Sequence, residues 1–266
     1  MYMAQKWTPK EERQKYHQLT DLYIDQNKTL QEIANILKIA PSTVYDRMMR
    51  LGISATPQRK KTYAARRQND ITIPKHYGPD LAEFFGIMLG DGKLSFYQVF
   101  VTLGTKELSY AEYVCDLMEK LFAVRPKITI RNTGHRIVYI GSRDLSSWLK
   151  NEGLVYNKVR SQVDVPRWIY IRKEFMKHFL RGFFDTDGSV YKLRFGIQIS
   201  FTNASKPLLT SVQFILRELG YKVSKISTIK CYVTKHHDVV RFFKEVKPAN
   251  PKHQERFAIF IKNPGR

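Results

Sequence analysis

Two aspartates give the clearest chemical signal in this sequence. Asp91 and Asp187 each close an apolar run that ends in Asp-Gly, FFGIMLGDG at 84–92 and LRGFFDTDG at 180–188. Both runs are predicted to be helices, and the carbonyl groups exposed at a helix C-terminus carry partial negative charge. Two carboxylates beside two such helix ends repel one another and attract a hard divalent cation. The pair therefore predicts a metal site where the two helix ends meet.

Small residues on one face of each run predict that the two helices pack closely. Gly86 and Gly90 occupy positions i and i+4 of the first helix, and Gly182 and Thr186 do so in the second. Residues at this spacing share a helix face, so the two backbones can approach closely along it. Packing along these faces brings the C-terminal ends, and with them Asp91 and Asp187, together.

The segments that follow the two runs repeat as well. In the first unit we expect strands at 98–103, 127–131 and 136–141 and helices at 106–122 and 142–152. In the second unit we expect strands at 194–202, 222–230 and 231–235 and helices at 206–219 and 238–246. Each unit reads helix, two strands, helix, two strands, helix. This succession predicts a pseudo-twofold α+β domain with two four-stranded antiparallel sheets.

Both runs resemble the motif of the LAGLIDADG homing endonucleases, and the resemblance covers roughly residues 79–262. The second copy keeps the defining residues Leu180, Gly182, Asp185, Asp187 and Gly188. The first copy keeps Gly86, Asp91 and Gly92 but has Leu89 where the motif has its earlier Asp. The resemblance implies the family's pseudo-twofold fold of two αββαββα repeats over 76–266, with repeats at about 76–165 and 166–266.

The resemblance also implies an activity and the residues for it. Family members are site-specific DNA endonucleases that hydrolyse phosphodiester bonds across the minor groove and make a metal-dependent double-strand break in a long target. The implied cofactor is Mg²⁺, with Mn²⁺ as a substitute and Ca²⁺ supporting binding without cleavage. The implied metal ligands are Asp91 and Asp187 with the backbone carbonyls of Gly90 and Thr186. The implied basic catalytic residues, assigned by their position after the last helix of each half, are Lys158 and Lys252.

Sheet faces turned towards DNA should carry polar and basic side chains at alternate positions. For any one of these residues, a merely solvated sheet face is the alternative interpretation; together they favour DNA. The predicted DNA-facing residues are Lys93, Ser95, Tyr97, Lys127, Thr129, Arg131, Tyr191, Lys192, Arg194, Gln198, Ser200 and Thr202.

The N-terminal segment, residues 1–53, predicts a small all-α domain. A capping box at Thr8 predicts a first helix that runs to about residue 26, and a capping box at Thr29 predicts the start of a second. Pro41 predicts the start of a third helix, which ends at Gly52. The second and third helices, joined by a short turn, resemble the helix-turn-helix family. A helical hairpin used for packing or protein binding is the alternative. The predicted DNA-facing residues are Ser42, Thr43, Tyr45, Arg47 and Arg50.

A basic segment at 54–75 follows this domain and predicts a linker. Either a solvated hinge or a strap that tracks the DNA backbone fits its composition. The residues predicted to contact DNA in the strap are Arg59, Lys60, Lys61, Arg66 and Arg67.

Charge and composition narrow the class of partner. The chain has 45 Lys and Arg against 24 Asp and Glu, a net charge of +21, which suits a polyanion such as double-stranded DNA. No apolar stretch approaches the length of a membrane span. Cys115 and Cys231 match no zinc spacing, so we expect free thiols in a reducing intracellular compartment, the cytoplasm, nucleoid or an organelle. Because one chain supplies both halves of the site, we expect a monomer.

Binding proteins are the main alternative to a nuclease. The LAGLIDADG fold also occurs in transcription regulators and in intron-splicing cofactors, for which intron RNA would be a partner. Two adjacent acids in a DNA-facing groove repel phosphate unless a metal intervenes, which favours the nuclease. The chain starts with Met and carries no terminal His-Asn, which disfavours an intein.

Overall fold

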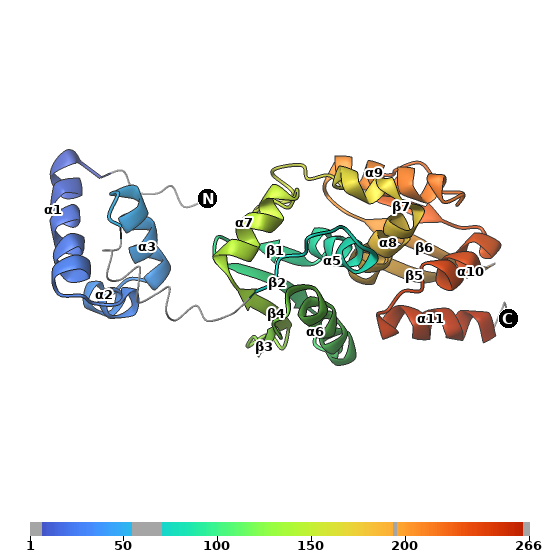
Figure 1. Ribbon diagram of the computed structural model, residues 1–266, viewed down its shortest axis with the longest axis horizontal. Coiled ribbons are helices and arrows are strands. Elements are labelled where there is room, and N and C mark those ends of the chain that lie inside the picture. The colour runs from blue at the N-terminus through green and yellow to red at the C-terminus, as the bar shows by residue number, and fades with distance from the viewer. Residues whose placement is uncertain (1–6, 55–70, 194–195, 263–266) are drawn as a thin grey trace. The chain divides into compact units, whose positions relative to one another are not determined.

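The computed structural model describes residues 7–54, 71–193 and 196–262. The chain divides into two compact units, Met1–Gln68 and Asn69–Arg266 (Figure 1). No helix in the described ranges is long and apolar enough to cross a membrane.

The N-terminal unit is helical, as the capping signals predict. It consists of α1 (Pro9–Thr20), a π-helical turn (Asp21–Asp25), α2 (Leu30–Leu37) and α3 (Pro41–Arg50). Both capping boxes form, with the Thr side chain accepting from the N3 backbone and Glu11 or Glu32 bonding back. The apolar residues buried between these helices are Leu19, Leu22, Tyr23, Ile33, Ala34, Val44, Met48 and Ile53. The predicted helix pair α2–α3 therefore shares one small core with α1 and the π-helical turn.

The first repeat of the larger unit follows the predicted element order. It comprises α5 (Pro79–Leu89), β1 (Gly92–Leu94), β2 (Gln98–Leu103), α6 (Leu108–Phe122), β3 (Lys127–Ile130), β4 (Arg136–Gly141) and α7 (Arg143–Asn151). Its four-stranded antiparallel sheet has the order β1-β2-β4-β3. A short 3₁₀ helix, η2 (Arg167–Ile171), leads into the second repeat.

The second repeat has the same plan with a smaller sheet. It comprises α8 (Lys173–Asp187), β5 (Gly188–Leu193), β6 (Gly196–Thr202), α9 (Lys206–Glu218), β7 (Lys230–Val233), α10 (His236–Glu245) and α11 (Pro251–Lys262). The fold is therefore α+β and pseudo-twofold, as predicted, and α11 is a helix that the sequence patterns did not predict.

The prediction of a fourth strand at 222–230 is wrong. The described strands of this sheet have the order β5-β6-β7, and Val223 makes only an isolated bridge to Val233. The Ser224 N–H donates to the Tyr232 carbonyl of β7 at 2.9 Å, but side chains bind neighbouring backbone groups. The Asp238 carboxylate accepts from the Lys222 backbone N–H at 3.0 Å, and Gln213 donates to the Ser224 carbonyl at 2.6 Å. Backbone groups satisfied in this way do not extend the ladder.

Helices α5 and α8 lie side by side at the centre of the unit (Figure 1). Their contact requires glycine, because a Cβ on Gly86 would overlap the Phe179 carbonyl and lie 2.7 Å from the Phe183 nitrogen. A Cβ on Gly182 would likewise overlap the Glu83 carbonyl. The predicted close packing of the two helix faces is confirmed. One hydrophobic core surrounds the pair and contains residues of both repeats.

Candidate active site

The packing of α5 against α8 brings the two motif ends together. Asp187 is the last residue of α8, and Asp91 follows Gly90, the C-cap of α5. A Cβ on Gly90 would overlap the Thr186 hydroxyl and would lie 3.5 Å from the carboxyl carbon of Asp187. The two partly buried carboxylates therefore stand at one place, at the junction of the two repeats.

Burial and mutual repulsion make these carboxylates hard to ionise. Burial raises the pKa of Asp187 to about 7, the nearby Asp91 adds to the rise, and Asn203, Lys158 and Lys252 oppose it. Burial also raises the pKa of Asp91, with Lys252 and then Lys158 as the opposing charges. A bound cation would stabilise the ionised form of two such buried carboxylates.

Lys158 lies against the C-terminal end of α5. Its ammonium donates to the carbonyls of Met88 at 3.1 Å and Leu89 at 3.2 Å, and also to that of Gly90. Burial lowers the pKa of Lys158, while Asp187 and Asp91 raise it. The lysine is therefore in the site, but it occupies the Gly90 carbonyl that the family resemblance implies as a metal ligand.

Lys252 lies at the start of α11, where its ammonium pairs with Glu107 at 2.8 Å. Among the charges that lower the pKa of Asp91, that of Lys252 has the largest effect. The structure thus places both predicted lysines at the two aspartates, one against the carbonyl end of a helix and the other against a carboxylate.

Asn203 is a site residue that the sequence patterns missed. Its amide donates to the Asp187 carboxylate at 2.7 Å. The pairing of Gly188 with Phe201 in β5 and β6 places residue 203 beside the end of α8, whereas the pairing of Gly92 with Val101 places Leu103 at the equivalent position in the first repeat. A single Asn at a strand end is also common in turns, so it gave no distinct signal.

The donor set fits a hard metal ion. In the described ranges no group of three or more His, Cys, Asp or Glu residues could hold a metal ion. Asp91 and Asp187 nevertheless offer carboxylate oxygens beside helix-end carbonyls, which is the oxygen-only chemistry that Mg²⁺ and Ca²⁺ prefer. The ammonium of Lys158 against three of these carbonyls shows that the helix end attracts a cation.

Most predicted sheet residues are accessible. Lys93, Tyr97, Lys127, Thr129, Arg131, Tyr191 and Lys192 are exposed, and Ser95, Gln198 and Thr202 are half-buried; Arg194 lies outside the described residues. The predicted alternation fails in β3, where Ile130 is 63% exposed, because β3 is the edge strand of its sheet.

Ser200 corrects the prediction that its side chain faces DNA. It is fully buried. It lies on the central strand β6, and its cross-strand partners are Ser189 on β5 and Tyr232 on β7. Because such partners share a sheet face, their side chains stand on either side of Ser200.

In the N-terminal unit the predicted arginines gather on an aromatic ring. The guanidinium of Arg50 lies 4.3 Å and that of Arg47 5.6 Å from the centre of the Trp7 ring, and the Lys15 ammonium lies 5.3 Å from it. Stacking of this kind orients a guanidinium, and the Nε of Arg50 also pairs with Glu12 at 3.7 Å. Ser42 is exposed and Thr43 and Tyr45 are half-buried, whereas Arg59, Lys60, Lys61, Arg66 and Arg67 lie outside the described residues.

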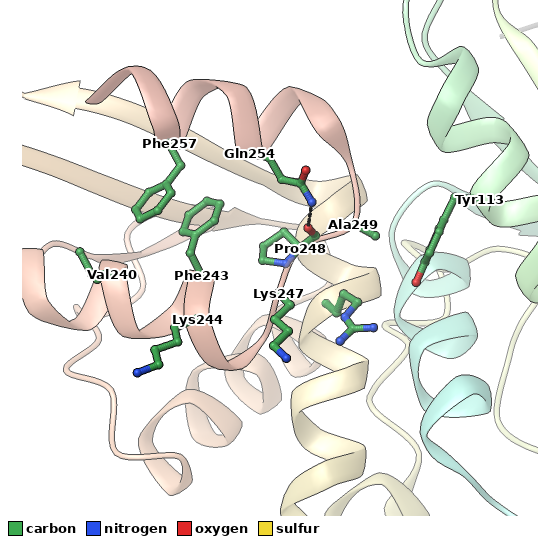
Figure 2. Close-up of a pocket in the computed structure, with 10 residues that line it drawn as sticks. Tyr113, Val240, Phe243, Lys244, Lys247, Pro248, Ala249, Gln254 and Phe257 are labelled. Carbon is green, nitrogen blue, oxygen red and sulfur yellow. Dashed lines mark hydrogen bonds between the residues drawn. The ribbon is translucent and has the colours of Figure 1, made fainter. Parts of the chain in front are cut away.

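A separate cavity of about 590 Å³ opens beside α8, α10 and α11. Figure 2 shows the rings of Phe243 and Phe257 lying against each other, with Tyr113 across the opening. Neither Asp91 nor Asp187 lines this cavity, so the clustered carboxylates lie outside it.

Residues 174–247 match the family profile described as a LAGLIDADG-like domain. The match takes in nearly all of α8 and the elements of the second repeat as far as α10, and it does not include α5. The N-terminal LAGLIDADG domain of DUF199/WhiA is similar in structure, at 15% identity over 66% of this chain and 86% of that chain, with a TM-score of 0.45. I-DmoI in complex with DNA and Ca is 17% identical over 63% of this chain and 88% of that chain, with a TM-score of 0.45.

A curated relative is the replication factor C small subunit of Methanocaldococcus jannaschii. It is 27% identical over 145 residues, which is 54% of this chain and 8% of the relative. The chain thus spans less than a tenth of that protein's length.

Proposed function

We propose that this protein is a site-specific DNA endonuclease that makes a divalent-metal-dependent double-strand break across the minor groove. The observation that carries the proposal is the meeting of Asp91 and Asp187 at two helix ends. The second of these helices lies in the segment that matches the LAGLIDADG-like profile. The net charge of +21 supports DNA as the substrate, because an excess of cations releases the counterions of a polyanion.

The proposed roles follow from the positions of the side chains. Asp91 and Asp187 would hold Mg²⁺, and the helix-end carbonyls, including that of Thr186, would add oxygen donors. When bound, the metal would polarise the scissile phosphate and lower the pKa of a coordinated water. Lys158 and Lys252 would offset phosphate charge beside the aspartates, and Asn203 would fix the orientation of the Asp187 carboxylate.

A DNA-binding regulator or a splicing cofactor is the second candidate. The helix pair α2–α3, with its exposed Ser42 and ring-stacked arginines, favours a DNA-binding module. Such a protein does not need two coupled carboxylates at the centre of its larger unit, and their presence favours the nuclease.

A selection for cleaved DNA separates these candidates. Purified protein is incubated with a randomised double-stranded library and Mg²⁺, and both cut ends and retained uncut duplexes are sequenced. Recovered double-strand ends with a constant overhang would support the nuclease and give its target. Retention of a sequence without any cut ends would contradict it and move the regulator or splicing cofactor ahead, with RNA as the next ligand to test.

Binding to the selected target should weaken steeply with salt. If the protein neutralises about 6–10 phosphates, its affinity should fall by about 10³–10⁵-fold between about 50 and 200 mM salt. Fluorescence anisotropy with a labelled duplex measures this slope. A flat response would contradict the electrostatic interpretation.

Removal of the N-terminal unit tests its proposed role as a DNA reader. A variant starting at Asn69 should keep its unfolding transition, because the larger unit has its own core. It should bind the selected site more weakly and protect a shorter footprint. An unchanged affinity and footprint would show that α2 and α3 do not contact DNA.

A further inference from the structure

A chain of hydrogen bonds links the motif of the second repeat to the start of α11. The fully buried Asp185 carboxylate accepts the backbone N–H groups of Ala249 at 2.8 Å and Asn250 at 3.1 Å. The Asn250 side chain donates to the Asp185 carbonyl at 3.1 Å and accepts the Lys252 backbone N–H at 3.2 Å. These bonds fix the backbone from which the Lys252 side chain extends.

The side chain of Lys252 is held from the other repeat. Glu107, directly before α6, accepts from the Gly104 backbone at 2.6 Å, from the Asn250 amide at 2.7 Å and from the Lys252 ammonium at 2.8 Å. Its side chain is only 15% exposed. Three donors around one enclosed carboxylate leave it little freedom, so it sets the position of the ammonium.

The two lysines of the site are therefore held differently. Lys158 donates to the carbonyls at the end of α5, whereas Lys252 reaches across the repeat boundary to a carboxylate. Leu89, at the first-repeat position equivalent to Asp185, is fully buried in the core and offers no side-chain acceptor. The first repeat thus lacks the bonds by which Asp185 anchors the backbone before Lys252.

We propose that Glu107 is a positioning residue that holds Lys252 beside Asp91, so that the first repeat controls the cleavage centre to which Lys252 belongs. The proposal rests on the nuclease function. It makes the two cleavage centres unequal: loss of Glu107 should slow the cutting of one DNA strand and leave the other unchanged. A residue with only a structural role would affect both strands together.

The test is strand-resolved cleavage by Glu107→Gln. A duplex carrying the selected target is labelled differently on its two strands, and single-turnover rates are measured for each. The Asn250 and Lys252 donors share Oε1 of Glu107, and the Gly104 N–H binds Oε2. A glutamine loses one of these acceptors and the charge that pairs with the ammonium, so Lys252 should be held less firmly and one strand should be cut about 10-fold or more slowly. Nicked duplex should accumulate. Glu112→Gln, the same change in a surface ion pair of α6 with Arg125, is the matched control and should cut both strands normally.

Lys252→Met and the double variant show whether Glu107 acts through the lysine. Lys252→Met should slow the same strand, and adding Glu107→Gln should cause no further slowing. Urea unfolding without metal gives a readout independent of cleavage. It is measured for the wild type, the two single variants and the double variant, and the effects of the two substitutions on the free energy of unfolding should be non-additive as well.

Each result decides between the proposals. Equal slowing of both strands by Glu107→Gln, or additive effects in the double variant, would overturn the positioning role while leaving the nuclease intact. If the wild-type protein cuts no DNA in the same assay, the nuclease function fails and the positioning role fails with it, whatever the unfolding data show.

Discussion

Asp187→Asn should abolish double-strand cleavage of the selected target while leaving DNA binding intact. An amide cannot supply the negative charge that holds a divalent cation, and the remaining Asp91 offers only half of the carboxylate pair. We expect the cleavage rate of the more affected DNA strand to fall by at least about 10²–10³-fold, as for the removal of one main electrostatic contact in an active site. Gel assays of cleavage and binding on one labelled duplex measure both effects.

The same variant should be more stable than the wild type when metal is absent. The folded-state pKa of Asp187 is raised from 3.8 to about 7, so the carboxyl group favours folding below about pH 4 and loses this contribution as the pH rises through 7. Asn carries no charge, and it can still accept the bond from Asn203. At about pH 8 in EDTA its melting temperature should therefore exceed that of the wild type.

Asp80→Asn is the matched control, because Asp80 lies at the start of α5 and pairs on the surface with Lys120 at 2.6 Å. It should leave cleavage unchanged. Normal double-strand cleavage by both Asp187→Asn and Asp91→Asn would rule out the proposed mechanism.

Gly182→Ala should strongly destabilise the larger unit. In an exposed helix this change stabilises by up to about 1 kcal/mol. Here the added Cβ would overlap the Glu83 carbonyl and lie 2.9 Å from the Ile87 nitrogen, and a backbone cannot move aside as a flexible side chain can. We expect a loss of about 3 kcal/mol or more in the free energy of unfolding, measured by urea denaturation.

The clash also predicts a loss of DNA cleavage in Gly182→Ala, because separating α5 from α8 separates Asp91 from Asp187. Gly78→Ala is the control: it makes the same change at the N-cap of α5, where a Cβ would meet nothing within 4 Å. Gly78→Ala should cost no more than about 1 kcal/mol, because alanine is a poorer N-cap than glycine but meets no steric clash there. Equal stability of the two variants would show that the helices do not pack through Gly182.

The sequence was sufficient for every feature whose signal is local. The capping boxes at Thr8 and Thr29 specify helix starts through bonds spanning three residues, and both form. The repeated runs ending at Asp91 and Asp187 carry their own glycines, so the close helix pair and the meeting of the two acids could be predicted. Their family resemblance supplied the positions of Lys158 and Lys252.

Features that depend on distant partners required the tertiary structure. The segment at 222–230 has strand-like composition, but it makes only isolated bridges, and Asp238 and Gln213 bind two of its backbone groups. Ser200 follows a polar alternation, yet its side chain is fully buried. Neither outcome follows from the residues within the segment itself.

The sharpest case is the pairing of Glu107 with Lys252, 145 positions apart in the chain. Many acids and many lysines in a basic chain could pair, and no periodicity selects one pair among them. Only the packing of the two repeats brings the loop before α6 to the start of α11, because the contact is made by side chains from different halves. The sequence alone indicated which two acids meet at the helix ends, and the tertiary structure decided which partners hold the neighbouring lysines.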